Sequence, residues 1–222
     1  MMRTMRTTIF APNEYYHLFS RGVNKNTLFF DDFDRARFLF LLLHFQSPTP
    51  LHNIGSYASS YVKKNSFGLG SEKLKEILEE RHVELISFCL MPNHLHILIK
   101  NIEEYAISVY MQRVLMAYAK YFNKKYKRYG HVFEGPFQAV HIKNNTQLLH
   151  TSAYIHRNPI ELTTPEIDYR TYPWSSCRDH LDTNRWAKLI IPDIISKQFK
   201  TLISYKNFVS TSPAKEHVPL LS

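Results

Sequence analysis

The stretch that most constrains the fold is Phe88–Lys100, which reads Phe-Cys-Leu-Met-Pro-Asn-His-Leu-His-Ile-Leu-Ile-Lys. Val83–Leu90 is a mostly apolar run, and Pro92-Asn93 follows it. Proline fits the second position of a tight turn and asparagine tolerates the third. These residues therefore predict a hairpin whose second strand is His94–Lys100.

Two histidines alternate with aliphatic residues along this second strand. Because successive side chains on a strand point to opposite faces, His94 and His96 share one face, and the other face holds Leu95, Ile97 and Ile99. Side chains two residues apart lie about 6.5–7 Å from each other, close enough for both rings to bind one ion. We expect the aliphatic face to enter the core and the imidazoles to lie opposite it. For an isolated His-x-His pattern, two half-exposed histidines on a solvated face remain the alternative.

Hydrophobic periodicity and capping residues predict the other elements. In chain order we expect a strand at Glu14–Arg21, a helix at Asp32–Phe45, a helix at Ser71–Arg81 capped by Ser71, the central hairpin, a helix at Ile102–Lys127, a strand at Val132–Ile142 broken at Gly135-Pro136, and a helix at Asn145–Arg157. Ser47–Gly70 lacks firm periodicity and is interpreted as an insertion. This order predicts an α+β sandwich with a mainly antiparallel sheet and helices on its aliphatic face.

The chain is expected to form one unit over residues 1–160, with the insertion near 47–70, and a C-terminal extension over 161–222 packed on it. Within the extension, Tyr172-Pro-Trp-Ser-Ser176 predicts a structured loop, and Ile194–Val209 predicts one or two amphipathic helices. The last residues, Ser210–Ser222, are expected to fray.

Charge and composition limit the classes of protein. The formal net charge of +9 favours a polyanionic partner, nucleic acid first and an acidic membrane surface second. Two cysteines exclude a disulfide framework and a cysteine-based zinc site. No stretch reaches the roughly 18 uninterrupted apolar residues that a membrane span needs, and the first residues lack the apolar region of a signal peptide. We therefore expect a soluble cytoplasmic protein.

The end of the longest predicted helix combines basic and aromatic residues. Its cations, interleaved with tyrosine and phenylalanine, are Lys120, Lys124, Lys125, Lys127 and Arg128. Cations contact phosphates and aromatic faces stack on bases, so this composition suits single-stranded nucleic acid. The alternative is an exposed helix end whose cations complement the helix dipole.

The predicted helix at Asn145–Arg157 places polar groups at four-residue spacing. His150, Tyr154 and Asn158 therefore lie along one face. Taken alone, a tyrosine in such a position is more often a core residue than a catalytic one.

Four motifs in one order resemble a known family. They are the aromatic strand with Ser20-Arg21-Gly22 within Tyr15–Asp34, Met91-Pro-Asn-His-Leu-His96, Tyr154-Ile-His-Arg-Asn-Pro159 and Tyr172-Pro-Trp-Ser-Ser176. From about Tyr15 to Val209 the chain resembles the REP-associated tyrosine transposases, single-tyrosine members of the His-hydrophobic-His (HUH) endonuclease superfamily. The longer Ser47–Gly70 segment departs from the family pattern, as does Val132-Phe-Glu-Gly-Pro136, where members often carry tryptophan and a more basic run.

The resemblance implies a ferredoxin-like fold of the HUH-endonuclease type that cuts and rejoins single-stranded DNA beside hairpins. His94 and His96 match the metal-binding pair, Tyr154 matches the nucleophile, and Asn158 falls at the place of a third polar ligand. The family implies Mg²⁺ or Mn²⁺, a monomer or a homodimer, and work at the nucleoid. We expect Arg21 and Arg157, which lie within the motifs, to bind DNA with the cations of the long helix. His150 is a possible accessory residue that replaces Asn158 as ligand or orients a phosphate.

The chemistry agrees with this resemblance. Displacement at a phosphodiester adds negative charge to the non-bridging oxygens, and a divalent cation stabilises that charge. A phenol with a pKa of about 10 needs positioning and help with its proton. Two imidazoles and an amide oxygen would also accept zinc, manganese or nickel.

Three alternatives to a strand transferase remain open on the sequence alone. A relative with the same fold could grip structured DNA or RNA without cutting it, because function belongs to sites and not to folds. An RNA-recognition-motif domain is disfavoured because it places stacking aromatics on the open sheet face, where this chain has histidines. A zinc hydrolase built on His94 and His96 would need an acidic third ligand, and none lies at a local spacing that supplies one.

Overall fold

One sheet of four strands organises the part of the chain that this computed structural model describes, residues 9–50, 52–162 and 168–213. The strands are β1 (Tyr15–Arg21), β2 (Val83–Met91), β3 (His94–Asn101) and β4 (Gln138–His141). Their order is β2-β3-β1-β4, and each neighbouring pair is antiparallel. The predicted hairpin is confirmed, with Met91 paired to His94 across the turn.

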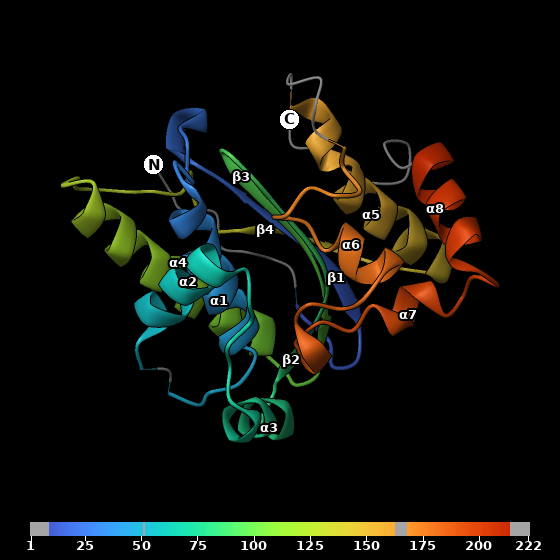
Figure 1. The fold of residues 1–222 in the computed structure, drawn as a ribbon, viewed down its shortest axis with the longest axis horizontal. Helices are drawn as coiled ribbons and strands as arrows, with labels where there is room; N and C mark the ends of the chain where they lie inside the picture. Colours follow the sequence, from blue (N-terminus) through green and yellow to red (C-terminus); the bar gives the residue numbers. More distant parts are fainter. Residues whose placement is uncertain (1–8, 51, 163–167, 214–222) are drawn as a thin grey trace.

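Helices cover both faces of this sheet. α1 (Asp32–His44) and α4 (Ala106–Lys125) lie on one face, and α5 (Asn145–Arg157) lies on the other (Figure 1). The succession β1-α1-β2-β3-α4-β4 with this strand order is the ferredoxin-like topology. The predicted α+β fold with a mainly antiparallel sheet is confirmed.

The aliphatic face of β3 enters the core as predicted. Leu95 and Ile97 are fully buried, and Leu18 of β1 lies beside Ile97 in the register. α1 and α4 close over them with large side chains such as Phe38 and Tyr118, whose rings meet edge to face at 5.0 Å. Burying this apolar surface on one sheet face fixes the register, since a one-residue slip would move every aliphatic side chain of β3 to the opposite face and put its histidines into the aliphatic core.

Several predicted boundaries are wrong for local reasons. α3 spans Ser71–Glu79, but its N-cap is Gly70 and not Ser71. α4 begins at Ala106 instead of Ile102, because Tyr105 takes a left-handed conformation with φ 62° at the N-cap. The strand predicted at Val132–Ile142 is reduced to β4, while Phe133, before the predicted break, forms only an isolated bridge with Gly22.

The predicted insertion at Ser47–Gly70 contains a helix that periodicity analysis missed. α2 spans Ile54–Lys64, and its Ala58 and Tyr61 are buried against α1. Tyr61 meets Phe40 with ring centroids 6.0 Å apart. Glycine and serine lower the intrinsic helix propensity of this segment, so packing on α1 stabilises a helix that its sequence alone supports weakly.

The C-terminal extension packs along the outer edge of β2. Ile190 forms a parallel bridge with Leu85, and Ser175 forms an antiparallel one with Cys89. Its short elements are α6 (Cys177–Leu181), which was not predicted, η3 (Ala187–Leu189), α7 (Asp193–Ser196) and α8 (Leu202–Thr211). The one or two helices expected at Ile194–Val209 are therefore two, α7 and α8, with shifted bounds, and most of Ser210–Ser222 lies outside the described residues.

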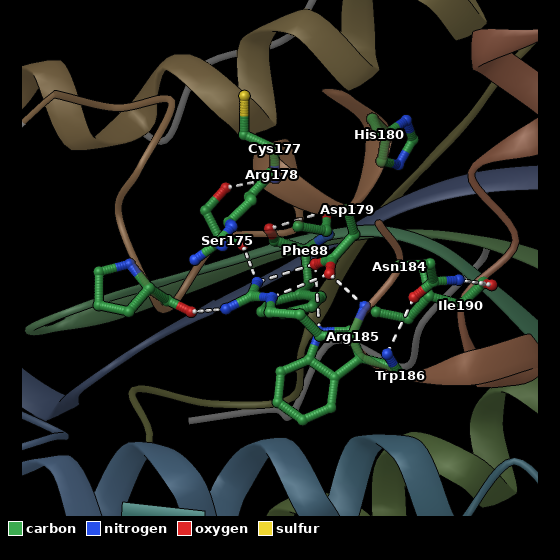
Figure 2. Close-up of polar contacts among 12 residues, drawn as sticks. Phe88, Ser175, Cys177, Arg178, Asp179, His180, Asn184, Arg185, Trp186 and Ile190 are labelled. Atoms are coloured by element: carbon green, nitrogen blue, oxygen red, sulfur yellow. Dashed lines mark hydrogen bonds and ion pairs between the residues drawn. The ribbon is translucent and has the colours of Figure 1, made fainter. Parts of the chain in front are cut away.

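A buried ion pair holds the loop that begins this extension. Asp179 accepts from Nε and Nη2 of Arg185 at 2.9 and 2.8 Å, and from Nε1 of Trp186 at 3.1 Å. Arg185 also donates to the carbonyls of Pro173 and Ser175 (Figure 2). Because a buried pair loses about 3–5 kcal/mol when one partner is removed, this pair fixes the loop firmly against the sheet.

The histidine face of the sheet is thus covered instead of open. α5 and η2 (Asn158–Glu161) lie over it, and His96 is only 1% exposed. Within the described ranges no helix combines the length and the apolar character that crossing a membrane would require.

Candidate active site

His94 and His96 project from β3 toward α5. Their ring centroids lie 5.2 Å apart, and the ring planes are nearly perpendicular at 82°. The alternation of β3 produces this pairing, as the sequence predicts. The two rings therefore lie beside each other at the start of β3.

The orientation of His94 is set by the turn that precedes it. Its Nδ1 lies 2.8 Å from Oδ1 of Asn93, and Nδ2 of Asn93 donates to the carbonyl of Lys25 at 3.3 Å. An amide oxygen only accepts, so Nδ1 of His94 carries the proton. In the neutral ring, Nε2 is then left with a lone pair.

Asn158 faces that lone pair from the end of α5. Its Nδ2 donates to the carbonyl of Tyr154 at 2.9 Å, which turns Oδ1 toward Nε2 of His94 at 3.3 Å. Two acceptors in such a contact repel each other unless a cation or a proton lies between them. This pair therefore fits a metal ion, which would take both lone pairs.

His96 offers a third donor atom beside His94. Its Nε2 is buried and has no hydrogen-bond partner among the residues that the structure describes. Its Nδ1 lies 2.9 Å from Nε2 of His17 on β1. An unpaired buried nitrogen costs free energy, and a metal ion would remove that cost.

Histidine, cysteine, aspartate and glutamate alone do not complete a metal site in residues 9–50, 52–162 and 168–213, where no group of three or more of them is suitably placed. A metal here would need the amide oxygen of Asn158 beside the two imidazoles. That donor set, two nitrogens and one oxygen, suits Mn²⁺ or Zn²⁺ and accepts Mg²⁺.

Burial keeps both imidazoles of β3 neutral, as a ligand must be. The pKa of His94 is lowered by desolvation, an effect opposed by Oδ1 of Asn158, which can accept a hydrogen bond from Nε2 only when the ring is protonated. The pKa of His96 falls well below its ordinary value because the ring is fully buried and lies beside His17. Neutral imidazole is the form that binds metals.

Tyr154 lies against the two histidines of the central strands. Its ring meets His96 at 5.3 Å and His17 at 5.9 Å between centroids, both edge to face. Desolvation raises the pKa of Tyr154, the charge of Glu161 raises it further, and a hydrogen bond with Asn158 lowers it. The phenol is therefore protonated at neutral pH and held beside the candidate metal ligands.

Arg21 is the predicted DNA-binding residue that lies closest to this cluster in the sheet. It pairs with His94 in the β1–β3 register, so their side chains share a face. Its charge contributes to lowering the pKa of His94, of His96 and of Tyr154. A guanidinium at this place can bind a phosphate that approaches the histidines.

The structure does not bring the accessory candidate His150, or the predicted DNA-binding residue Arg157, into the cluster. Nδ1 of His150 lies 2.7 Å from Oγ of Ser212, and its ring packs on Phe208. Arg157 donates to the carbonyl of Ser212 at 2.6 Å. Both side chains point toward α8, so Asn158 is the better placed third ligand.

α4 ends at Lys125 instead of the predicted Lys127, so the predicted cations lie at the end of α4 and just beyond it, and they differ in their surroundings. Lys125 lies 2.7 Å from carboxylate oxygens of Asp31 and of Asp34. Arg128 stacks its guanidinium over Phe122 at 5.5 Å. Lys120, Lys124 and Lys127 are exposed, and so is Lys125 despite its ion pairs.

This basic helix end lies at the same end of the sheet as the histidines but on the opposite face. Tyr118 of α4 donates to the carbonyl of Leu28, whose own nitrogen donates to the carbonyl of Pro92 in the hairpin turn. A strand of nucleic acid that reaches both surfaces would have to pass around this end.

Sequence reasoning missed two residues of the cluster, His17 and Asn93. Alternation along β1 already places His17, Phe19 and Arg21 on one face. Asn93 was interpreted only as a turn residue. A search for hydrogen-bond partners of the predicted metal ligands, and not only for the ligands themselves, would have found both residues.

Comparisons with known proteins agree with the motifs. The family model described as "Transposase IS200 like" matches residues 57–158, which include β3 and all of α5. The match agrees with the family that the motifs predict, over less than half of the chain. No curated protein matches the chain.

A solved structure described as "Structure of the REP associates tyrosine transposase bound to a REP hairpin" is also similar. The likeness covers 83% of this chain and 88% of that chain, with 14% sequence identity and a TM-score of 0.49. A likeness of this strength supports no statement about activity.

Proposed function

We propose that this chain is an IS200-like transposase, since that family's model matches residues 57–158, and that it cuts and rejoins single-stranded DNA beside hairpins through a covalent bond between Tyr154 and a 5′ phosphate. The observation that carries the proposal is the convergence of a phenol, two imidazoles and an amide oxygen within one chain. Tyr154 packs on His96, and Asn158 contacts both Tyr154 and His94.

The chain's own residues would position the reacting groups. His94, His96 and Asn158 would hold Mg²⁺ or Mn²⁺, which supplies charge stabilisation to the non-bridging oxygens of the scissile phosphate when bound. Arg21 would bind a neighbouring phosphate and fix the register of the strand. Burial excludes water from the phenol, which disfavours hydrolysis relative to transfer.

The proposed step conserves atoms and bond energy. The Oη of Tyr154 forms a bond to phosphorus while the bond from phosphorus to the 3′ oxygen breaks, and the phenolic proton ends on that 3′ oxygen. The phosphotyrosine diester keeps the energy of the original linkage, so a 3′ hydroxyl can reverse the step. Reversal by a different 3′ end is strand transfer.

Tyr154 is proposed to act on the metal site of its own chain, because it already contacts His96 of that chain. Mixing a Tyr154→Phe protein with a His96→Asn protein tests this: separate sites leave the mixture inactive, whereas exchange of tyrosine helices in a homodimer would restore cleavage. Light scattering would show whether the protein is a monomer or a homodimer.

The central experiment is an adduct assay with hairpin-bearing oligonucleotides. We expect a covalent protein–DNA band on a denaturing gel in Mn²⁺ or Mg²⁺, and its loss in Tyr154→Phe or in chelator. A band that persists in Tyr154→Phe would assign the nucleophile elsewhere. Tight, salt-sensitive binding without metal-dependent cleavage across many hairpins would favour the non-cleaving binder instead. The expected cytoplasmic, nucleoid-associated location rests on this DNA-directed role.

A further inference from the structure

His17 is a buried histidine that neither the motifs nor the proposed chemistry uses. It lies on the central strand β1 and pairs with Leu98 of β3 and Val140 of β4. Its exposure is 1%, and its ring lies nearly parallel to that of His96, at 24° and 5.1 Å between centroids. Neighbours on both sides therefore hold it in one place.

The two rings share one proton. Nε2 of His17 and Nδ1 of His96 are 2.9 Å apart, so one nitrogen donates and the other accepts. Each neutral ring carries a single N–H. The outer nitrogens, Nδ1 of His17 and Nε2 of His96, find no hydrogen-bond partner in the described part of the chain. Nothing at the outer ends of this pair therefore decides which way the proton points.

Only one of the two arrangements is compatible with a metal ligand. If His17 donates, His96 must carry its proton on Nε2, and that nitrogen cannot bind a cation. If His96 donates through Nδ1, its Nε2 keeps a lone pair that is free to bind a cation beside His94, whose ring lies 5.2 Å away between centroids. The acceptor for that donation is Nε2 of His17.

We propose that His17 is a positioning residue that accepts the Nδ1 proton of His96 and so holds His96 in the one tautomer that binds a divalent cation. This inference rests on the proposed metal-dependent function, since it concerns the same site. It gives the site two matched supports, because Asn93 accepts the corresponding proton of His94. Partners of this kind fix ring orientation and raise the basicity of the ligand nitrogen.

The test compares two replacements of His17 in the full-length protein. His17→Gln keeps an acceptor oxygen near the position of Nε2, whereas His17→Leu keeps apolar volume and removes the acceptor. We expect His17→Leu to bind Mn²⁺ about 10–100-fold more weakly than the original protein, as losses of such partners typically do, and His17→Gln to retain most of the affinity. Titration of Mn²⁺ alone, followed by the loss of its free electron paramagnetic resonance signal, measures this directly.

A matched control separates this effect from the loss of any buried imidazole. His44 on α1 is also buried, and its Nε2 likewise has no hydrogen-bond partner among residues 9–50, 52–162 and 168–213, but it lies on the other face of the sheet. His44→Leu should leave Mn²⁺ affinity unchanged. Circular dichroism and thermal melts without metal verify that each variant folds.

A second measurement reads the tautomer itself. Long-range ¹⁵N–¹H spectra of the histidine rings, with Zn²⁺ as a diamagnetic probe, should show His96 protonated on Nδ1 and His17 protonated on Nδ1. In metal-free His17→Leu, His96 should shift toward the Nε2-protonated form. A role limited to packing would move neither signal.

The outcomes distinguish this inference from the function on which it rests. Equal Mn²⁺ affinity in folded His17→Leu and the original protein overturns the role of His17 alone. Metal binding that depends on His17 without adduct formation on any hairpin leaves His17 a positioning residue and overturns the strand-transfer proposal. Failure of the original protein to bind Mn²⁺ overturns both.

Discussion

Two histidine-rich clusters lie on the same side of the sheet, and they differ in how their polar atoms are satisfied. The Tyr154 cluster consists of His17, His94, His96, Tyr154 and Asn158. The Tyr205 cluster, which joins α5 to the C-terminal extension, consists of Ser87, Ser152, His156, Ser176, His180 and Tyr205. α5 contributes to both.

Every ring nitrogen of the Tyr205 cluster has a partner. His156 bonds to Oγ of Ser176 at 3.0 Å and to the hydroxyl of Tyr205 at 2.9 Å. His180 contacts the carbonyl of Ile86 at 2.9 Å and the hydroxyl of Tyr205 at 3.4 Å. Such a closed network stabilises a structure and offers nothing to a ligand.

The Tyr154 cluster, by contrast, leaves acceptors facing one another and buried nitrogens unpaired within the described residues. Both clusters contain a tyrosine, histidines and nearly complete burial, so composition does not separate them. The difference lies in unsatisfied atoms, which native interiors rarely keep without a functional reason. α5 therefore packs on the extension through Ser152 and His156, and it carries Tyr154 of the candidate site on another face.

The largest expected effect comes from exchanging the two tyrosines for phenylalanine. Tyr154→Phe should abolish the covalent adduct, because no nucleophile remains. Tyr205→Phe should keep it but lower the free energy of unfolding by about 1–3 kcal/mol, since His156 and His180 lose a shared partner. Gel assays and urea denaturation measure the two effects. If folded Tyr205→Phe also fails to form an adduct, the division between the clusters is wrong.

Lowering the pH should weaken the Tyr205 cluster next. Burial lowers the pKa of His180 to about 4 and that of His156 well below its ordinary value. The unfolded chain therefore binds protons first, near pH 6.5, and the free energy of unfolding falls as pH drops from there toward 4. Each histidine contributes a slope approaching about 1.4 kcal/mol per pH unit.

Denaturation curves between about pH 7.5 and 4.5 test this. The interval begins above the histidine pKa of the unfolded chain and covers most of the range down to the lowered pKa of His180 in the folded protein. His180→Gln should reduce the limiting slope of the free energy of unfolding against pH by the contribution of one proton. Tyr205→Phe keeps both histidine rings and should not change that slope. A slope unaltered in His180→Gln would mean that other groups govern acid unfolding.

The sequence predicts those parts of the two clusters that follow from local spacing. It does not predict the parts that depend on how the strands pair. The alternation around His94 and His96 is local, and so is the helix Asn145–Arg157, whose predicted bounds are those observed. His17 could not be assigned in the same way. Its nearness to His96 follows from the pairing of Phe19 with His96, which the whole sheet sets.

The extension was harder still to predict. Its packing along β2 depends on the Asp179–Arg185 pair, which holds the loop, and on the hydrogen bonds of Ser176 with Phe88, which lies 88 residues away in the chain. No period in the sequence encodes such contacts. The sequence correctly predicts that the two imidazoles lie opposite the aliphatic face. It does not predict that α5 and η2 bury them.

Metal should stabilise the protein through one cluster only. At a Mn²⁺ concentration of about 100 times the dissociation constant, the free energy of unfolding should rise by about 2.7 kcal/mol. His94→Ala should lose this gain, whereas Tyr205→Phe should retain it in full. Thermal melts with and without Mn²⁺ provide the measurement, and an equal gain in His94→Ala would place the ion elsewhere.

The smallest expected effect applies the same contrast to two adjacent surface lysines. Both lysines are exposed, but Lys125 is paired with Asp31 and with the buried Asp34, whereas Lys124 forms no ion pair within the described residues. If unsatisfied groups are the ones that bind ligands, Lys124→Gln should reduce the slope of log affinity against log salt by about 0.7 for single-stranded DNA. Lys125→Gln should leave that slope unchanged and lower stability instead, because Asp34 loses its cation. Fluorescence anisotropy at several salt concentrations separates the two, and a larger slope change in Lys125→Gln would show that DNA displaces the internal ion pair.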